Sequence, residues 1–446
     1  MAVQTLYPTK ALECWPKMKE LRREHHRHNT RVQESGGPVV VGIAEQFLAL
    51  LAGLGDYATW QYEPRFTACM RNHEEAISNF EHLEAHGYGR DLCNSLRVHM
   101  GGILRGHLHE ALKGRKPDFV FQFEICPFSI KTALFAGEQL GVPVLTLDTI
   151  GRYRPGPIDT PYIVDQLQEL IERMEQITGR PYDDERLLEA TRNEWDCSVL
   201  WAEISDLTRK VPAPIDYRHM QSLRIPVIVD RDKPHIVAFY REMLDEVKDR
   251  VAKGISARGF EDARLLYEGF MPFHNVSMLR WPERYGAIFV GGGFTFTSFG
   301  SWNLHEDGRW TPAVRWVDRG LPLRTREDAL RALVDLYMGN DTERRPFANI
   351  LYIRTRPEEQ MCRIRDWRAD GVVMGVERRC RVQFLVQAEQ ITVMQDNGIP
   401  VVDFDPSSAD PREFDEVQAY SRVSALLEGM GLQKRAIAES DGQDSD

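Results

Sequence analysis

Short apolar runs, each closed by turn residues, alternate along this chain with segments of helical spacing. In the first third of the chain, the runs at 39–43, 119–123 and 144–147 are β-branched or aromatic, and segments 45–54 and 129–140 have apolar residues at helical spacing. A parallel strand needs a crossover connection to its neighbour, so strands separated by helices form parallel sheets that are covered on both faces. This pattern predicts an α/β fold.

The same alternation returns in the last third of the chain. Apolar runs at 265–269, 286–290, 372–374 and 399–404 predict the strands of a second sheet. The segment 161–260 between the two sets of strands is polar and helical in pattern. We therefore predict two Rossmann-like parallel-sheet domains with an intervening helical region.

The chain length agrees with more than one domain, because 446 residues exceed the size at which a single hydrophobic core stops growing. The expected division is an N-terminal helical segment at 1–34, a first α/β domain at 35–160, a helical region at 161–260, a second α/β domain at 261–436 and a disordered acidic tail at 437–446.

Charge and composition exclude some classes of protein. A net charge of -11 makes nucleic acid an unexpected partner, since phosphate binding needs clustered positive charge. The chain has no apolar run of about 18 residues, and residues 1–19 lack the apolar centre of a signal peptide. We therefore expect a cytoplasmic protein without a membrane segment, whose seven cysteines stay reduced.

Three of the cysteines, Cys93, Cys126 and Cys380, occur where the chain passes from one predicted element to another. Cys126 and Cys380 follow predicted strands of different domains, so their side chains could meet in the cleft between the domains. Thiolates are the usual ligands of iron-sulfur clusters, and three of them would leave one iron of a four-iron cluster without a protein ligand. The alternative is three buried thiols without metal. The remaining cysteines are expected to be small core residues: Cys14, Cys69, Cys197 and Cys362.

The motifs of other enzyme classes are absent from the sequence. Gly291-Gly292-Gly293 follows a predicted strand, but no GxGxxG spacing and no Gly-Lys-Ser/Thr pair accompanies it. We interpret it as a loop near an apolar substrate, and expect any ATP to be bound by another chain. The histidines lack zinc-site spacing, and no Gly-x-Ser-x-Gly elbow indicates a serine hydrolase.

The segments around the three cysteines resemble a known family. Residues 84–93, 116–126 and 370–380, followed by Gly398-Ile399-Pro400 and Arg422, are similar to the 2-hydroxyacyl-CoA dehydratase and benzoyl-CoA reductase family. The resemblance spans roughly residues 35 to 430, and is greatest to the larger catalytic subunit of ATP-dependent benzoyl-CoA reductase.

This resemblance implies one 4Fe-4S cluster on Cys93, Cys126 and Cys380, with one open iron site. It also implies an acyl-CoA substrate and several protein partners: a related cluster-bearing subunit, ATP-hydrolysing electron-activating subunits and a ferredoxin-type donor. The expected activity is electron delivery to the aromatic ring of benzoyl-CoA, which gives a cyclohexadiene carbonyl-CoA.

Proton supply needs a titratable group near the reacting atoms. Glu45 at the start of the first predicted helix, His274 after a strand of the second domain and Glu377 three residues before Cys380 are the candidates. Each of the three also has a structural interpretation; Glu45, for example, could stabilise a helix N-terminus.

Two alternatives differ in function. One is a subunit of an (R)-2-hydroxyacyl-CoA dehydratase, which would need ATP only for occasional activation instead of at every turnover. The other is a scaffold subunit with buried thiols and no metal.

Overall fold

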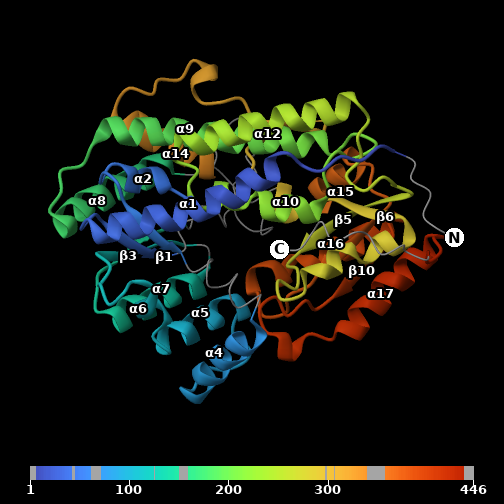
Figure 1. Ribbon diagram of the computed structural model, residues 1–446, viewed down its shortest axis with the longest axis horizontal. Coiled ribbons are helices and arrows are strands. Elements are labelled where there is room, and N and C mark those ends of the chain that lie inside the picture. The colour runs from blue at the N-terminus through green and yellow to red at the C-terminus, as the bar shows by residue number, and fades with distance from the viewer. Residues whose placement is uncertain are drawn as a thin grey trace.

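The computed structural model describes most of the chain. The described residues are 7–42, 46–61, 72–124, 126–149, 159–296, 299–305, 307–338 and 357–435. Two separate four-stranded parallel sheets and a layer of long helices make up this part of the protein (Figure 1). The predicted fold class is confirmed.

The first sheet has the strand order β2-β1-β3-β4, with every pair parallel. Its strands are β1 (Val39–Gly42), β2 (Ala58–Gln61), β3 (Phe119–Phe123) and β4 (Val144–Leu147). One face packs against α1 (Cys14–Glu34), α6 (His107–Ala111) and α7 (Pro127–Leu140). The other face packs against α2 (Leu48–Ala52), α8 (Thr160–Thr178), α9 (Asp184–Leu207) and α14 (Arg326–Met338).

The second sheet has the order β10-β9-β5-β6, again with every pair parallel. Its strands are β5 (Ala263–Gly269), β6 (Ala287–Gly292), β9 (Gly371–Gly375) and β10 (Val401–Phe404). One face is covered by η2 (Val276–Tyr285) and α17 (Glu416–Gly429), and the other by α13 (Gly293–Phe296), α15 (Pro357–Asp366) and α16 (Arg381–Asp396).

The two sheets have the same topology. In each, the second strand lies on one side of the first, and the third and fourth strands follow on the other side. The first strand of each sheet ends in a glycine, Gly42 or Gly269, with φ of 151° and 77°. A Cβ atom there would lie 2.0 Å from the Phe121 carbonyl oxygen or 2.1 Å from that of Gly375, so only glycine fits at either position. The second domain therefore repeats the architecture of the first.

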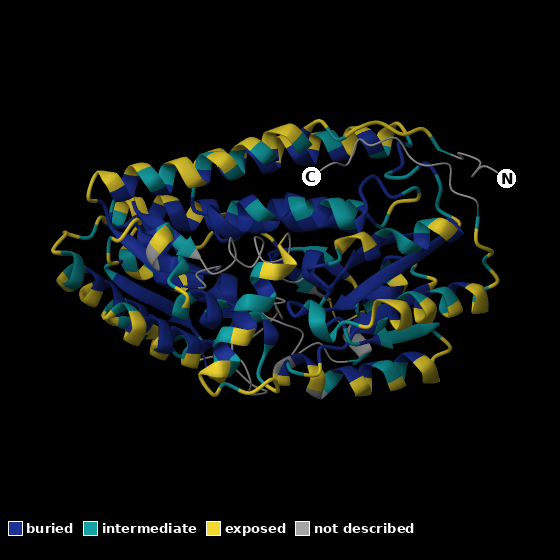
Figure 2. Ribbon diagram, turned by 60° about the horizontal axis from the view of Figure 1, so that its bottom comes forward, coloured by how far each residue is buried: buried dark blue, intermediate teal, exposed yellow. Residues whose placement is uncertain are grey.

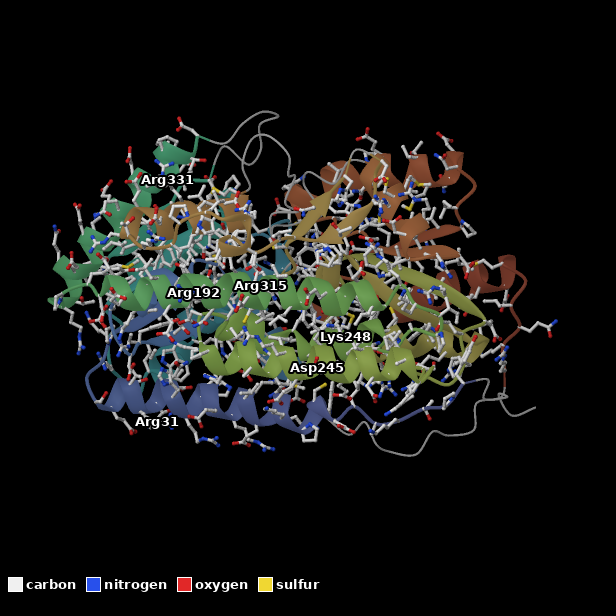
Figure 3. The ribbon with its side chains drawn as sticks, turned by 90° about the horizontal axis from the view of Figure 1, so that it is seen from above. Arg31, Arg192, Asp245, Lys248, Arg315 and Arg331 are labelled. Carbon is white, nitrogen blue, oxygen red and sulfur yellow. The ribbon has the colours of Figure 1, made fainter. Side chains whose placement is uncertain are left out.

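Long helices connect the two sheet units. α9 packs against α2 and α14 of the first unit and also against β8 (Trp310–Pro312) and α13 of the second. α12 (Pro234–Ala252) lies along α9, and short helices α10 (Tyr217–Leu223) and α11 (Ile225–Val229) pack beneath it. Figure 3 looks onto α1, α9 and α12, whose outer faces carry charged side chains such as Arg192, Asp245 and Lys248.

The core lies between the sheets and their helices. Figure 2 shows buried strands inside and exposed residues on the outer helix faces. α4 (His73–Ala85) and α5 (Asn94–Leu104) belong in sequence to the first unit, but Phe80 and Val98 pack into the core of the second. Among the described helices, each is either too short or too polar to span a membrane.

Some elements differ from the sequence prediction. β2 and the antiparallel pair β7 (Trp302–Leu304) and β8 were not predicted, because polar residues interrupt the apolar residues of each and leave no apolar run. The predicted first helix at 45–54 is shorter in the structure, where α2 begins at Leu48. The tail at 437–446 lies outside the described residues.

Candidate metal centre

Each of the three singled-out cysteines immediately precedes a helix. Cys93 is the N-cap residue of α5, Cys126 that of α7 and Cys380 that of α16. Cys126 follows β3 and Cys380 follows β9, the third strand of its sheet in each case. These are equivalent positions, beside the point where the strand order reverses, and ligands of open parallel sheets bind there.

The three cysteines and Glu377 form one electrostatic group. Burial raises the pKa of Cys93 well above its ordinary value, and negative charge on Cys380, Glu377 and Cys126 raises it further, while the Leu96 backbone N–H opposes the rise. Residues from three separate segments therefore act on the Cys93 thiol. Cys380 is buried, and Cys93 and Cys126 are half-buried.

The Cys126 turn is fixed by local hydrogen bonds. The Cys126 backbone N–H donates to Ser129 Oγ at 3.2 Å, and Ser129 Oγ donates to the Cys126 carbonyl oxygen at 2.7 Å. Burial raises the pKa of the Cys126 thiol, and the N–H groups of Ser129 and Phe128 oppose that rise. The helix N-terminus thus supports negative charge on a sulfur that burial otherwise keeps protonated.

The three cysteines supply the type of donor that an iron-sulfur cluster uses. Within the described parts of the chain, no three His, Cys, Asp or Glu side chains are close enough to bind one metal ion. A four-iron cluster with three cysteine ligands attaches each sulfur to a different iron, so the sulfurs lie farther apart than the ligands of one ion. One buried and two half-buried thiols at three helix N-termini are soft donors of this kind.

An ionic network joins the two sheet units beside the cysteines. Glu84 of α4 accepts hydrogen bonds from Arg97 of α5 at 2.6 Å and from Arg412 at 2.7 Å, and Arg90 donates to it at 2.9 Å. Arg412 belongs to η4 (Pro411–Glu413) of the second unit. Burial alone would raise the pKa of Glu84, but the three arginines outweigh it and lower the pKa to about 2. The network fixes the start of α5, and with it Cys93.

The dipeptide Ser407-Ser408 makes a second connection between the units. Asn94 Nδ2 donates to Ser407 Oγ at 3.1 Å, and the Ser95 and Ser408 hydroxyl groups are 3.3 Å apart. The Ser408 N–H donates to Glu377 Oε2 at 2.7 Å. Ser407 has a φ of 40°, a left-handed conformation that a non-glycine residue adopts only when its surroundings hold it. Residues next to Cys93 and Cys380 are therefore tied to one short loop.

The sequence matches a known family over most of this structure. Residues 66–430, which include all three cysteines, match the family model described as 2-hydroxyglutaryl-CoA dehydratase, D-component. The chain belongs to the 2-hydroxyacyl-CoA dehydratase family. The predicted membership of this family is thereby confirmed, whereas the predicted greater likeness to the benzoyl-CoA reductase subunit is not shown.

Curated relatives in this family are dehydratase subunits. Lactoyl-CoA dehydratase subunit alpha of Anaerotignum propionicum is 23% identical over 374 residues, which cover 80% of this chain and 82% of that protein. The (R)-phenyllactyl-CoA dehydratase alpha subunit of Clostridium sporogenes is 24% identical over 367 residues, 80% and 81% of the two chains. The (R)-2-hydroxyisocaproyl-CoA dehydratase alpha subunit of Clostridioides difficile is 23% identical over 428 residues, 94% and 96%. These relatives support the dehydratase alternative and give no support to the reductase prediction.

The three candidates for proton supply have different surroundings in the structure. Glu45 lies outside the described residues. Glu377 is buried, and burial raises its pKa. His274 is also buried, and its Nε2 lies 3.2 Å from the Ser407 carbonyl oxygen. The Ser407-Ser408 loop thus joins His274 and Glu377, a connection that no sequence motif indicated. Their proposed role in proton supply stays a prediction.

His274 should make the stability of the protein depend on pH. Burial lowers its pKa from 6.5 to about 4, so the folded chain stays unprotonated where the unfolded chain binds a proton. Its contribution is complete above pH 6.5 and is lost as the pH falls toward 4. We expect the wild type to lose up to about 3 kcal/mol more stability than His274→Gln between pH 7 and pH 4, measured by urea unfolding. His86→Gln, at an exposed position, is the control and should show the same dependence of unfolding free energy on pH as the wild type. If His274→Gln also showed this dependence, the prediction would be contradicted.

Other predicted features are placed as follows. Cys14 and Cys197 are buried core residues as predicted, Cys362 is half-buried, and Cys69 lies outside the described residues. The glycine loop ends β6 and starts α13, and Gly291 and Gly292 line a small pocket with Phe296. The predicted loop is therefore the junction of β6 and α13, which borders this pocket.

Proposed function

We propose that this chain is the alpha-type subunit of an enzyme that removes water from a 2-hydroxyacyl-CoA, and that it carries a 4Fe-4S cluster. The observation that supports the proposal most is the position of Cys93, Cys126 and Cys380 at the N-termini of three helices, where the two sheet units meet. The printed names of the relatives, all of them dehydratase alpha subunits, support the reaction class.

The protein residues would hold and tune the cluster. When bound, it would supply electron exchange and Lewis acidity at the one iron without a cysteine ligand. The helix N-termini behind the sulfurs stabilise the thiolate form, and metal binding would release the thiol protons that burial otherwise retains. The network of Glu84 with its arginines and the Ser407-Ser408 loop would fix Cys93 relative to Cys380.

The proposed complex contains further subunits. The relatives are alpha subunits by name, so we propose a related cluster-bearing partner for this chain as well. The sequence has no Gly-Lys-Ser/Thr pair, so ATP hydrolysis is assigned to separate electron-activating subunits, supplied by a ferredoxin-type donor.

An assay of the complete complex tests this function. The complex, purified without oxygen through a tag on this chain, is given (R)-lactoyl-, (R)-2-hydroxyisocaproyl- or (R)-phenyllactyl-CoA with ATP and a strong reductant. We expect the unsaturated acyl-CoA to form with far less than one ATP hydrolysed per product, because the electron is not consumed in a dehydration. Dearomatisation of benzoyl-CoA with continuous ATP hydrolysis would instead identify a reductase. A complex without iron and without either activity would identify a scaffold subunit.

A further inference from the structure

A buried carboxyl group lies where three helices of the first sheet unit meet. Glu194 of α9 is fully buried, and α2 and α14 both pack against α9 (Figure 1). The Ala49 backbone N–H of α2 donates to Glu194 Oε1 at 2.6 Å, and the Tyr337 hydroxyl group of α14 donates to Glu194 Oε2. Glu194 therefore connects the start of α2 to both of the helices that cover it.

The start of α2 has a backbone conformation that needs support. Phe47, its N-cap residue, has a φ of 61°, which is uncommon for a residue other than glycine. The Phe47 ring centroid lies 4.6 Å from that of Tyr337 and 6.3 Å from that of Phe123, and the Phe47 N–H donates to the Tyr337 hydroxyl oxygen. A left-handed residue of this kind persists only where its surroundings fix it, so the contacts with Tyr337 and Glu194 stabilise this turn.

Among the described residues, the charged groups around Glu194 come from outside α2, which has no charged side chain. Arg231 attracts the negative charge of Glu194, and Asp232 repels it. The Arg231 guanidinium group has other partners: its Nε donates to the Val227 carbonyl oxygen at 2.8 Å, and its Nη1 lies 3.4 Å from the Tyr337 hydroxyl oxygen. Further ionisable groups in this region are Tyr57, Cys197 and Lys233.

These surroundings favour the protonated form of Glu194. Its two hydrogen-bond donors are neutral groups, and burial removes the water that would hydrate a carboxylate. Burial raises the pKa of Glu194 from 4.5 to about 7, although Arg231, the Tyr337 hydroxyl group and the Ala49 N–H oppose the rise. At neutral pH the buried group is therefore only partly ionised, whereas the same group exposed to water would be fully ionised.

We propose that Glu194 is a pH-sensitive switch, whose protonated form keeps α2 packed against α9 and whose ionised form lets α2 open more easily. Opening exposes the carboxyl group, which then loses its proton, so a rise in pH favours the open form. The stabilisation by Glu194 is complete below pH 4.5 and is lost as the pH rises through 7. Phe47 packs against Phe123 of β3, three residues before Cys126, so the switch acts beside the strand that leads to this cysteine. The inference goes beyond the proposed function and does not depend on it.

Hydrogen–deuterium exchange of the α2 amides tests the inference without an activity assay. The complex, purified without oxygen through a tag on this chain, is measured as wild type and as Glu194→Gln at pH 6 and pH 8, and each exchange rate is divided by the intrinsic rate at that pH. We expect the opening equilibrium of α2 to rise about tenfold more in the wild type than in Glu194→Gln, because glutamine keeps an acceptor for the Ala49 N–H but cannot ionise. Glu189→Gln, at an exposed position of the same helix, is the matched control and should behave as the wild type does.

A second variant keeps the inference open to contradiction. Tyr337→Phe removes a donor to the carboxylate, so the rise of the opening equilibrium should move to higher pH than in the wild type. An equal rise in the wild type and Glu194→Gln would overturn the inference, since another group would then cause the rise. If Glu194→Gln disrupts α2 at both pH values, Tyr337→Phe decides, and an unchanged pH midpoint in that variant would overturn the inference. A wild-type complex without dehydratase activity would contradict the proposed function and leave this inference intact.

Discussion

Cys380→Ser is expected to remove most of the iron from the anaerobically purified complex and to lower dehydratase activity by more than about 100-fold. A serine hydroxyl is a hard donor with a much higher pKa than a thiol, and at the buried Cys380 position it would not ionise readily. Cys93→Ser and Cys126→Ser should have the same effect, because the proposed cluster needs all three sulfurs. The measurements are iron and acid-labile sulfide per chain, the electron paramagnetic resonance spectrum of the reduced complex, and product formation.

The matched control is Cys362→Ser. Cys362 is half-buried like Cys93 and Cys126 but is outside the group of three, so iron content and activity should be those of the wild type. Full iron content in Cys380→Ser would contradict the proposed ligand set, whatever the activity of that variant. Iron loss in Cys362→Ser would show that a general effect on folding, and not ligation, removes the metal.

Glu84→Gln should lower the free energy of unfolding by about 3 kcal/mol at neutral pH. Arg97 is fully buried and bonds Glu84 at 2.6 Å, so the substitution leaves a buried guanidinium without its carboxylate. Arg412 keeps Asp410 as a partner at 2.7 Å, which limits the loss to one side of the network. Because Glu84 links α4 and α5 to the second sheet unit, the loss should also loosen the connection that fixes Cys93.

The pH dependence of this loss follows from the Glu84 pKa. Burial raises the pKa of Glu84, but the arginines outweigh burial and lower this pKa to about 2, below the ordinary value of 4.5. The stabilisation is therefore complete above pH 4.5 and is lost as the pH falls toward 2. Urea unfolding of wild type and Glu84→Gln should differ by a constant amount from pH 7 to pH 5, and by less below that range. Glu81→Gln, at an exposed position of the same helix, should match the wild type. Equal stability of all three proteins at pH 7 would contradict the prediction.

Part of the candidate site was predictable from the sequence. The runs at 119–123 and 372–374 are β3 and β9, so the prediction that Cys126 and Cys380 each follow a strand of a different sheet is confirmed. Cys93 follows no strand, and it was grouped with the other two by its position between predicted elements and by the family resemblance. The interaction of its thiol with Cys380 and Cys126 appears only when the chain is folded.

The residues that connect the two units were not predictable. Arg412 and Glu84 are 328 positions apart, and Ser407 and Asn94 are 313 apart. Neither pair belongs to a motif, because the sequence around Arg412 or Ser407 does not differ in kind from the sequence around an exposed arginine or serine. The burial of Gln360, Gln383 and Gln387 was missed for a similar reason: a glutamine in a helix is usually exposed, and its burial depends on the sheet against which the helix packs.

The fold class, the two sets of parallel strands and the family were predictable from the sequence, because periodicity and short motifs are local properties of a chain. Three features were visible only in the folded chain: the shared topology of the two sheets, the position of each of the three cysteines at a helix N-terminus, and the contacts of Glu84 and Ser407 that join the two units. These features depend on contacts between residues far apart in the sequence, which form only when burial of the apolar faces brings the units together.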